Sequence, residues 1–462
     1  MTEKIYVVTD LGPGDGGKGG VVHAVCKMTD AHTIIKEGGA NGSHGVRTAA
    51  GESFAFSQWG CGTFEGVRTH ISPRMVISPE GLLNESDALR FGHGIHNAFD
   101  LLTVDQRALC ATQYHGIVSR LKELARGSNP RGTVGTGVGE AVRYAERSRY
   151  LAIRAIDLRN PGLAEKLQAI REEASLELAT IGRDGLTPAD AALAEEERAK
   201  LSSSEFFDFC VEQMHKVSEE LRIVSPQFFT KRILARDGVA IVEKSHGVLT
   251  DKVYGFHPHT SALRTLTVFT KEMLREEGFS GKIVNIGVTR AYAIRHGAGP
   301  LPTDDPGMYE TLLPGSHKQD NRYQGRVRVG PLDLTLLRYA IDVCGGSTAF
   351  DGLAVTWFDQ IQANGVWPVC HRYRDMGNKN FFAPDGVIKV FRGQASEEQT
   401  SYQELLGREL RTCLPEVTEY KIPIEGDRDE LYSECDAVLK TELGVPVRMV
   451  SFGPTERDKM FK

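Results

Sequence analysis

The residues with the clearest chemical potential lie near the start of the chain, in the glycine-rich stretch 10–20, which reads DLGPGDGGKGG. Glycines let backbone N–H groups approach phosphate oxygens, and Lys18 adds a positive charge. The spacing from Gly12 to Lys18 is that of a P-loop, although Gly19 stands where a serine or threonine hydroxyl would hold Mg²⁺. Because a hard cation needs oxygen ligands, Asp15, the carboxylate inside the loop, is the candidate ligand. The stretch predicts a phosphate-binding loop; the alternative is a glycine-rich turn without a ligand.

A second glycine loop, residues 37–45 with the sequence EGGANGSHG, follows the apolar run 33–35. It offers the amide of Asn41 and the imidazole of His44 among residues small enough for a ligand to come close. A lone histidine is more often structural than catalytic, whereas this one lies in a loop with glycines nearby. The residues alone leave both roles open for His44.

These loops need a framework of strands and helices to position them. Residues 5–9 form an apolar run typical of a buried strand, and residues 21–28 are predicted to be helical. Further strands are predicted at 33–36, 74–78, 240–242, 282–286 and 352–356, and helices at 99–126 and at 161–222, the latter broken near 182–188. This alternation predicts an α/β fold with a large, mainly parallel central sheet. Such sheets bind ligands at the carboxyl ends of their strands, where 352–356 would deliver Trp357 to Asp359.

The chain shows neither a repeat of fixed period nor a low-complexity linker. We therefore expect residues 1–462 to form a single domain. It would combine the P-loop-like phosphate loop and the sheet with helical insertions, chiefly over about 160–240, and with smaller peripheral subdomains.

Composition points to a soluble enzyme. Of the 462 residues 40% are hydrophobic, and 55 basic against 61 acidic side chains give a formal net charge of −6, which argues against a nucleic-acid coat. The eight cysteines form no CxxC pair, so neither a zinc knuckle nor a disulfide framework is predicted. The sequence begins with a strand rather than a signal peptide, and no apolar run approaches the ~20 residues of a membrane helix. We expect small-molecule partners, no nucleic acid, no membrane and a cytoplasmic location.

The two glycine loops resemble those of the adenylosuccinate synthetase family, which ligates aspartate to C6 of a purine nucleotide. Further segments resemble the family in the right order: 56–60 with 78–79, 132–139, 295–303, 325–333, 356–359 and 451–454. The resemblance covers nearly the whole chain, and only about 160–240 shows no clear match.

The resemblance implies a reaction in two steps. The γ-phosphoryl group of a nucleoside triphosphate passes to the purine O6, and the aspartate nitrogen then displaces phosphate at C6. By this resemblance Asp15 takes the N1 proton and also binds Mg²⁺, and His44 donates to the leaving diphosphate. Lys18 and the loop N–H groups stabilise the transferred charge, since phosphoryl transfer depends mostly on positioning and charge neutralisation.

The same resemblance implies the remaining site residues. Those for the triphosphate are Gly14, Gly16, Gly17, Lys18, Gly19, Trp357, Asp359, Gly453 and Pro454. Those for the acceptor nucleotide are Asn41, Thr133, Val134, Arg147, Arg149, His246 and Ser261. Arg322, Arg326 and Arg328 would bind aspartate, because guanidinium groups suit carboxylates, and Asp15 and Ser43 would hold Mg²⁺. Either Arg147 or Arg149 would reach the nucleotide of a partner subunit, which implies a homodimer.

Four positions depart from the family pattern. Val134 replaces a phosphate-binding threonine, His246 a glutamine and Ser261 a threonine, while Trp357 replaces a lysine beside the retained Asp359. The retained carboxylate favours guanine, whereas an indole stacks on any base. The choice between GTP and ATP as donor, and between IMP and another 6-oxopurine nucleotide as acceptor, therefore stays open.

Three functions are consistent with these residues. The first is a divergent adenylosuccinate synthetase that acts on IMP. The second is a sibling ligase that acts on dGMP or GMP, like the phage enzymes that make 2-aminoadenylosuccinate. The third is a purine-nucleotide-binding regulator without catalysis. Because Asp15, His44, Lys18 and the loop arginines occur together, the sequence favours an enzyme.

Overall fold

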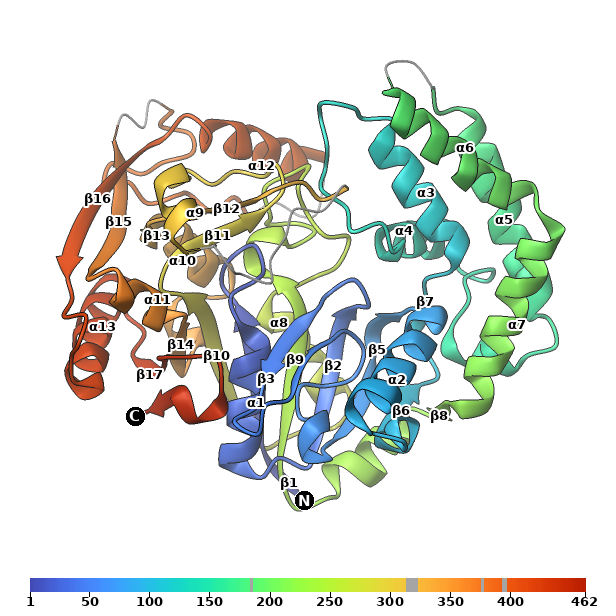
Figure 1. Cartoon of the computed structure of the whole chain (residues 1–462), viewed down its shortest axis with the longest axis horizontal. Helices are drawn as coiled ribbons and strands as arrows, with labels where there is room; N and C mark the ends of the chain where they lie inside the picture. Colours follow the sequence, from blue (N-terminus) through green and yellow to red (C-terminus); the bar gives the residue numbers. More distant parts are fainter. Residues whose placement is uncertain (183–185, 313–322, 375–377, 393–396) are drawn as a thin grey trace.

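The computed structural model describes residues 1–182, 186–312, 323–374, 378–392 and 397–462, and one large sheet crosses its centre (Figure 1). The strand order is β18-β17-β14-β10-β1-β9-β2-β5-β6-β8, with β7 paired to β5. The bounds are β1 (Thr2–Asp10), β2 (Thr33–Gly39), β5 (Arg68–Ile77), β6 (Leu102–Asp105), β7 (Leu109–Cys110), β8 (Arg222–Val224), β9 (Gly238–Gly247), β10 (Lys282–Arg290), β14 (Gly352–Thr356), β17 (Val447–Ser451) and β18 (Lys459–Phe461). These neighbours pair in parallel, except that β17 and β18 are antiparallel. The predicted α/β fold with a large, mainly parallel sheet is confirmed.

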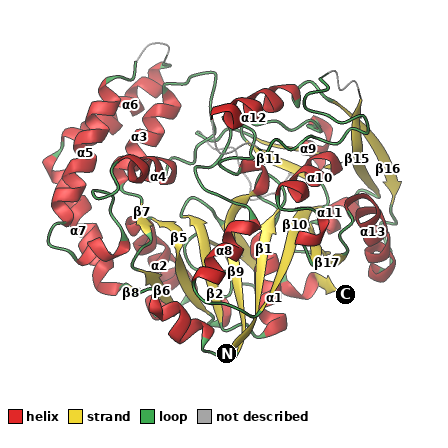
Figure 2. Cartoon of the chain, turned by 180° about the vertical axis from the view of Figure 1, so that it is seen from behind, coloured by secondary structure: helices red, strands yellow, loops and turns green. Residues whose placement is uncertain are grey.

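Strand β1 is buried on both faces, as is usual in parallel sheets. Because side chains alternate along a strand, Ile5 and Val7 belong to the core beneath helix α8 (Thr267–Glu276), whereas Val8 belongs to the core beneath helix α1 (Lys18–Thr29). The two helices lie on opposite faces of the sheet, α1 toward the viewer in Figure 1 and α8 toward the viewer in Figure 2. The strand is thereby fixed from both sides, and so is the loop at its carboxyl end.

A group of helices flanks the β6–β8 edge of the sheet (Figure 1, cyan and green). It comprises α3 (Gln113–Leu124), α4 (Val138–Arg147), α5 (Leu163–Ala179), α6 (Pro188–Ser202) and α7 (Ser204–Glu220). Helices α5 and α6 pack on α3, and α7 packs on α2 (Pro79–His93). The helical prediction for 161–222 is confirmed by α5, α6 and α7, although Arg222 already belongs to β8. Of the break predicted near 182–188, residues 183–185 lie outside the described residues, and α6 begins at Pro188.

The single helix predicted over 99–126 is wrong in its first half. Residues 102–105 and 109–110 are β6 and β7, which both pair in parallel with β5. All four residues of β6 are buried, so sheet burial outweighs helical preference there. Helix α3 begins only after Thr112, whose hydroxyl accepts the N–H of His115 in a capping box.

Smaller sheets and further helices surround the carboxyl edge of the large sheet. They are β3 (His44–Arg47) with β4 (Ser53–Phe56), β11 (Ala293–His296) with β12 (Val327–Gly330), and β13 (Leu332–Asp333) with β15 (Val366–Arg374) and β16 (Leu414–Lys421). The helices are α9 (Pro306–Leu312), α10 (Leu334–Val343), α11 (Phe358–Ala363), α12 (Glu397–Glu409) and α13 (Arg428–Leu443). Within the described ranges, none of the helices has the length and apolar character needed to span a membrane.

Candidate active site

A cavity of ≈ 670 Å³ opens where the strands of the central sheet end. This volume suits nucleotide-sized ligands. Its walls include most residues that the sequence singled out: Gly14, Asp15, Gly17, Lys18, Gly19, Asn41, Ser43, His44, Thr133, Val134, His246, Ser261 and Trp357. The other predicted residues in the described part of the chain do not line this cavity: Gly16, Arg147, Arg149, Arg326, Arg328, Asp359, Gly453 and Pro454. Arg322 lies outside the described residues.

The glycine loop between β1 and α1 is organised by Asp10, a residue that sequence reasoning left out. Its carboxylate accepts the backbone N–H groups of Gly12 and Gly16 and the Lys18 ammonium, each at 2.8 Å. Both charged side chains are buried, at 0% and 3% exposure, so the ion pair fixes where the ammonium points. The signal was available in the sequence, since Asp10 is the last residue of the strand that enters the loop.

The missing P-loop hydroxyl at Gly19 has a steric cause. A β-carbon at this position would lie 2.3 Å from the carbonyl oxygen of Gly45, in the second glycine loop. The two loops therefore pack backbone to backbone, and only glycine fits. A serine or threonine ligand therefore cannot stand at this position.

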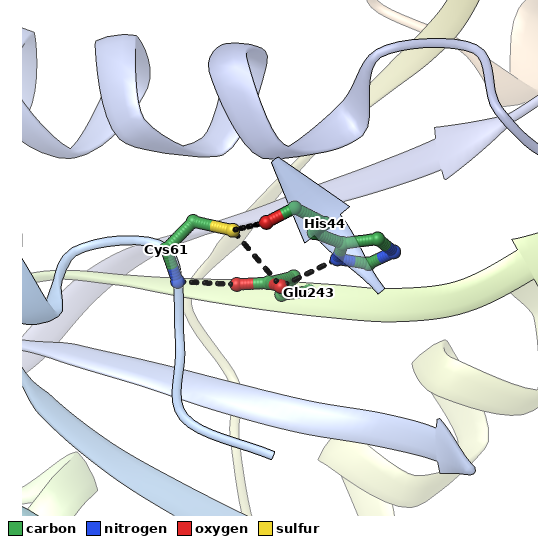
Figure 3. Close-up of side chains that lie close together, drawn as sticks. All are labelled: His44, Cys61 and Glu243. Carbon is green, nitrogen blue, oxygen red and sulfur yellow. Dashed lines mark hydrogen bonds and ion pairs between the residues drawn. The ribbon is translucent and has the colours of Figure 1, made fainter. Parts of the chain in front are cut away.

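His44 is the first residue of β3, and the buried carboxylate of Glu243 on β9 holds its side chain (Figure 3). The His44 Nδ1 lies 2.6 Å from Glu243 Oε1, which also accepts the Lys36 ammonium at 2.7 Å. Lys36 and Glu243 are register partners on β2 and β9, so the sheet itself creates this pair. Burial lowers the pKa of His44 to about 4, against the opposing effect of Glu243. A carboxylate that orients one ring nitrogen leaves the other to act on a ligand.

His44, Cys61 and Glu243 also resemble a metal-ligand set, because their ligand atoms lie within 4.8 Å of one another. The Lys36 ammonium already provides a positive charge at this carboxylate. Burial raises the pKa of the Cys61 thiol well above its ordinary value, which keeps it protonated. The cluster therefore serves to orient His44 and not to hold a cation.

Asp15 is held in the left-handed backbone region, with φ of 61°. Such a conformation in a residue other than glycine stores strain and persists only where neighbours impose it. The Arg290 Nε donates to the Asp15 carbonyl at 2.6 Å, and His296 Nδ1 lies 3.2 Å from Asp15 Oδ2. Sequence reasoning assigned no role to Arg290 or His296.

His246 faces the cavity from the carboxyl end of β9, also in the left-handed region with φ of 65°. Burial, followed by the charges of Lys18 and His44, lowers its pKa to about 4, so the imidazole is neutral near pH 7. Its Nε2 is buried and has no hydrogen-bond partner among the described residues. The Oδ1 of Asn41 is likewise buried and unpartnered in the described structure. Unsatisfied polar atoms in a cavity wall are typical of a ligand site.

Of the residues predicted to bind the phosphate of the acceptor nucleotide, Thr133 and Val134 line the cavity and Arg147 and Arg149 do not. Val134 is 37% exposed, and Thr133 Oγ1 lies 3.0 Å from Ser119 Oγ. Arg147 is exposed and pairs with Glu173, and Arg149 is exposed.

The predicted aspartate loop contributes to a cluster of guanidinium groups. Arg328 Nη2 donates to Gly297 O at 2.6 Å, and burial lowers the pKa of Arg328. Arg295, which lines the cavity, is fully buried; burial and the charges of Arg328 and Arg411 lower its pKa to about 9. Arg326 is exposed. Buried cations crowded in this way attract an anion such as a carboxylate.

Trp357 and Asp359 lie at the end of β14, as predicted. The Trp357 ring lies 4.3 Å from the Arg290 guanidinium carbon, and its backbone has φ of 61°. Burial raises the pKa of Asp359, while the nearby Lys459 opposes this effect. Lys459 donates to Gly453 O at 2.6 Å. Segments 356–359 and 451–454 thus lie together around one cation.

Comparisons with known proteins identify a family and a shared fold. The family model described as adenylosuccinate synthetase matches residues 7–461. The adenylosuccinate synthetase of Deinococcus radiodurans is 29% identical over 413 residues, which cover 87% of this chain and 90% of that protein.

Two solved structures share the fold. Fully ligated adenylosuccinate synthetase from Plasmodium falciparum has a TM-score of 0.76 at 16% identity and covers 99% of both chains. Cyanophage S-2L succinoaminodeoxyadenylate synthetase, bound to dGMP and dATP, has a TM-score of 0.56 at 15% identity over 100% of this chain and 96% of that chain.

Proposed function

The chain belongs to the adenylosuccinate synthetase family, and on that premise we propose that it joins L-aspartate to C6 of IMP with GTP as the phosphoryl donor. Membership makes it a carbon–nitrogen ligase of purine biosynthesis, in a GTP-dependent family. We further propose that residues 1–462 act as one domain, in the cytoplasm and as a homodimer.

One observation carries the proposal. Asp15, Lys18 and His44 come from two loops and line the same cavity, and each is held by its own partner: Arg290, Asp10 and Glu243. Proximity of this kind supplies much of the rate of a phosphoryl transfer. A decayed site would have no reason to maintain a strained Asp15 and a buried Glu243.

In the first step Asp15 accepts the N1 proton of the 6-oxopurine, and O6 attacks the γ-phosphorus of the triphosphate. His44 donates to the leaving diphosphate through the ring nitrogen that does not face Glu243. Burial lowers its pKa to about 4, and the charge of a bound triphosphate would raise it. In the second step the aspartate amine attacks C6, the C6–O6 bond breaks, and phosphate leaves with the O6 atom and the proton that the amine loses.

A magnesium ion fits the donor set at the phosphate loop. The Asp15 carboxylate lines the cavity beside Lys18, and Ser43 is exposed to the same cavity from the second loop. These hard oxygen atoms and the phosphates themselves are the ligands that Mg²⁺ prefers. When bound, the ion would neutralise charge on the transferred phosphoryl group.

The arginines Arg295, Arg326 and Arg328 would bind the two carboxylates of aspartate, together with Arg322. Asn41, Thr133, His246 and Ser261 would hold the acceptor nucleotide. Asp359, Gly453 and Pro454 would contact the donor base, with Trp357 stacked on it. Arg147 or Arg149 would act in the partner's site, which agrees with their exposure on this chain.

A second candidate acceptor is dGMP, which the phage synthetase of the same fold binds. The observation that favours it is the identity of the acceptor wall, where neutral His246 stands in place of a glutamine and Val134 in place of a threonine. These are the positions that would contact a different base or sugar.

A matrix assay tests both candidates. IMP, dIMP, GMP and dGMP are each offered with GTP, ATP or dATP, and aspartate-dependent phosphate release is measured. We expect IMP with GTP to react fastest, and Asp15→Ala serves as the inactive control. Faster turnover of dGMP would replace the first candidate by the second, and no aspartate-dependent release from any pair would overturn the ligase proposal.

A further inference from the structure

Arg290 is a buried cation at the carboxyl end of β10, with 3% exposure. It is the register partner of Thr356 on β14, directly before Trp357. It lines both the large cavity and a smaller one beneath the phosphate loop. Its guanidinium therefore lies between the predicted donor-base segment and the predicted phosphate segment.

The partners of Arg290 are neutral. Nε donates to the Asp15 carbonyl and Nη1 donates to Tyr292 Oη, both at 2.6 Å, and the Trp357 ring covers one side of the group. Within the described ranges it has no carboxylate at ion-pair distance, and Nη2 makes no hydrogen bond. The lysines Lys18 and Lys36 differ in this respect, because each has a buried carboxylate partner.

A buried charge without a counter-ion is costly unless a ligand supplies one. The cavity that Arg290 lines contains the glycine loop, whose backbone suits phosphate oxygens. A guanidinium fork matches a phosphate group in geometry and charge. The anion that fits is therefore a polyphosphate.

We propose that Arg290 binds the polyphosphate of the donor nucleotide and, through its stack on Trp357 and its bond to Asp15, aligns the donor with the phosphate loop. The proposal rests on the proposed function for the identity of the donor. It differs from a purely structural role, in which Arg290 would only hold the Asp15 backbone in its left-handed conformation.

Tryptophan fluorescence gives a binding signal without turnover. Trp59 and Trp367 are buried, at 0% and 2% exposure, and donate their indole N–H groups to Ala98 O and Ala291 O. Trp357 lines the cavity, so we expect its emission to report on the donor. Trp357→Phe serves as the control that assigns the signal.

The experiment titrates the full-length protein with GTP·Mg²⁺ and, separately, with guanosine. Arg290→Met should weaken GTP binding by about tenfold or more, as expected for losing a charged hydrogen bond, and should leave guanosine binding within about twofold. Arg372→Met, an exposed arginine paired with Glu416, should bind both as the wild type does. If Arg290→Met does not fold, Arg290→Lys replaces it, because it keeps the charge and loses the fork; GTP binding should then weaken by several-fold.

An equal loss of GTP and guanosine binding would show a structural role and overturn the proposal. Unchanged GTP binding in the folded Arg290 variant would do the same. The proposed ligase function is tested separately by the matrix assay. A failed ligation with Arg290-dependent GTP binding would remove the proposed function and leave this assignment standing.

Discussion

The role of Glu243 can be tested by removing its charge. Its carboxylate is fully buried and accepts from the Lys36 ammonium at 2.7 Å, from His44 Nδ1 at 2.6 Å and from the Cys61 N–H at 2.9 Å. Glu243→Gln keeps the shape and one acceptor oxygen, and it leaves Lys36 without a counter-charge in the core. Breaking one side of a buried ion pair costs ~3–5 kcal/mol of unfolding free energy.

The same variant should also slow the chemistry. With a glutamine, His44 loses the charged acceptor that orients its ring and supports its protonated form. A positioned proton donor contributes ~10²–10⁴-fold in rate, so we expect kcat for aspartate-dependent phosphate release to fall by about 10²-fold. The KM for aspartate should change little, because the arginine cluster is separate from His44.

The two effects are separated by a double variant. Lys36→Met with Glu243→Gln removes both charges of the pair, so thermal unfolding should recover much of the lost stability. We expect kcat to stay low in the double variant, since His44 still lacks its carboxylate. Recovery of kcat together with the melting temperature would refute the reasoning, because it would show that Glu243 serves only to neutralise Lys36.

The remaining predictions concern the catalytic carboxylate, the two substrate pockets and acid stability. Asp15→Ala should abolish ligation while the protein stays folded by circular dichroism, and near-full activity would remove Asp15 from the site. Arg328→Leu should raise the KM for aspartate far more than that for either nucleotide, because the variant loses the ~1.5–3 kcal/mol of binding free energy of a charged hydrogen bond. An unchanged KM for aspartate would contradict the placement of Arg328. Trp357→Lys should increase the kcat/KM ratio of GTP over ATP, and equal ratios would show that the indole does not face the base. Burial lowers the pKa of His70 and His115 to about 4, so stability should be complete above pH ~6.5 and fall between pH ~6.5 and 4 as the unfolded state takes up protons, which chemical denaturation at graded pH would detect.

The sheet was predictable because its strands contain short apolar runs. The runs at 5–9, 33–36, 240–242, 282–286 and 352–356 all became strands of the central sheet. The failure at 99–126 has a physical origin, since residues 102–105 acquire their strand conformation from β5 and β8 on either side. A pairing with residues that are distant in sequence leaves no local signal.

The loop residues that line the cavity could be singled out from the sequence, whereas the residues that support them could not. The glycine-rich setting indicates these loop residues in the sequence: Gly14, Asp15, Lys18, Asn41 and His44. Their partners are single polar residues inside apolar strands, and only the register of the sheet brings them to the site. Glu243 pairs with Lys36 because β9 lies beside β2 in register, and such pairing follows from topology rather than from spacing along the chain.

The distribution of charge in the cavity decides where anions bind. Lys18, the residue that the P-loop pattern emphasises, is already neutralised by Asp10 at 2.8 Å. In the described part of the chain, Arg290 and Arg295 are buried without a carboxylate partner. Arg290 is the last residue of β10, and Arg295 lies in β11. Arg290 contacts the phosphate loop through the Asp15 carbonyl, and Arg295 lies near Arg328 of the arginine loop. Under the proposed function, Arg290 would attract the anionic donor and Arg295 the carboxylates of aspartate.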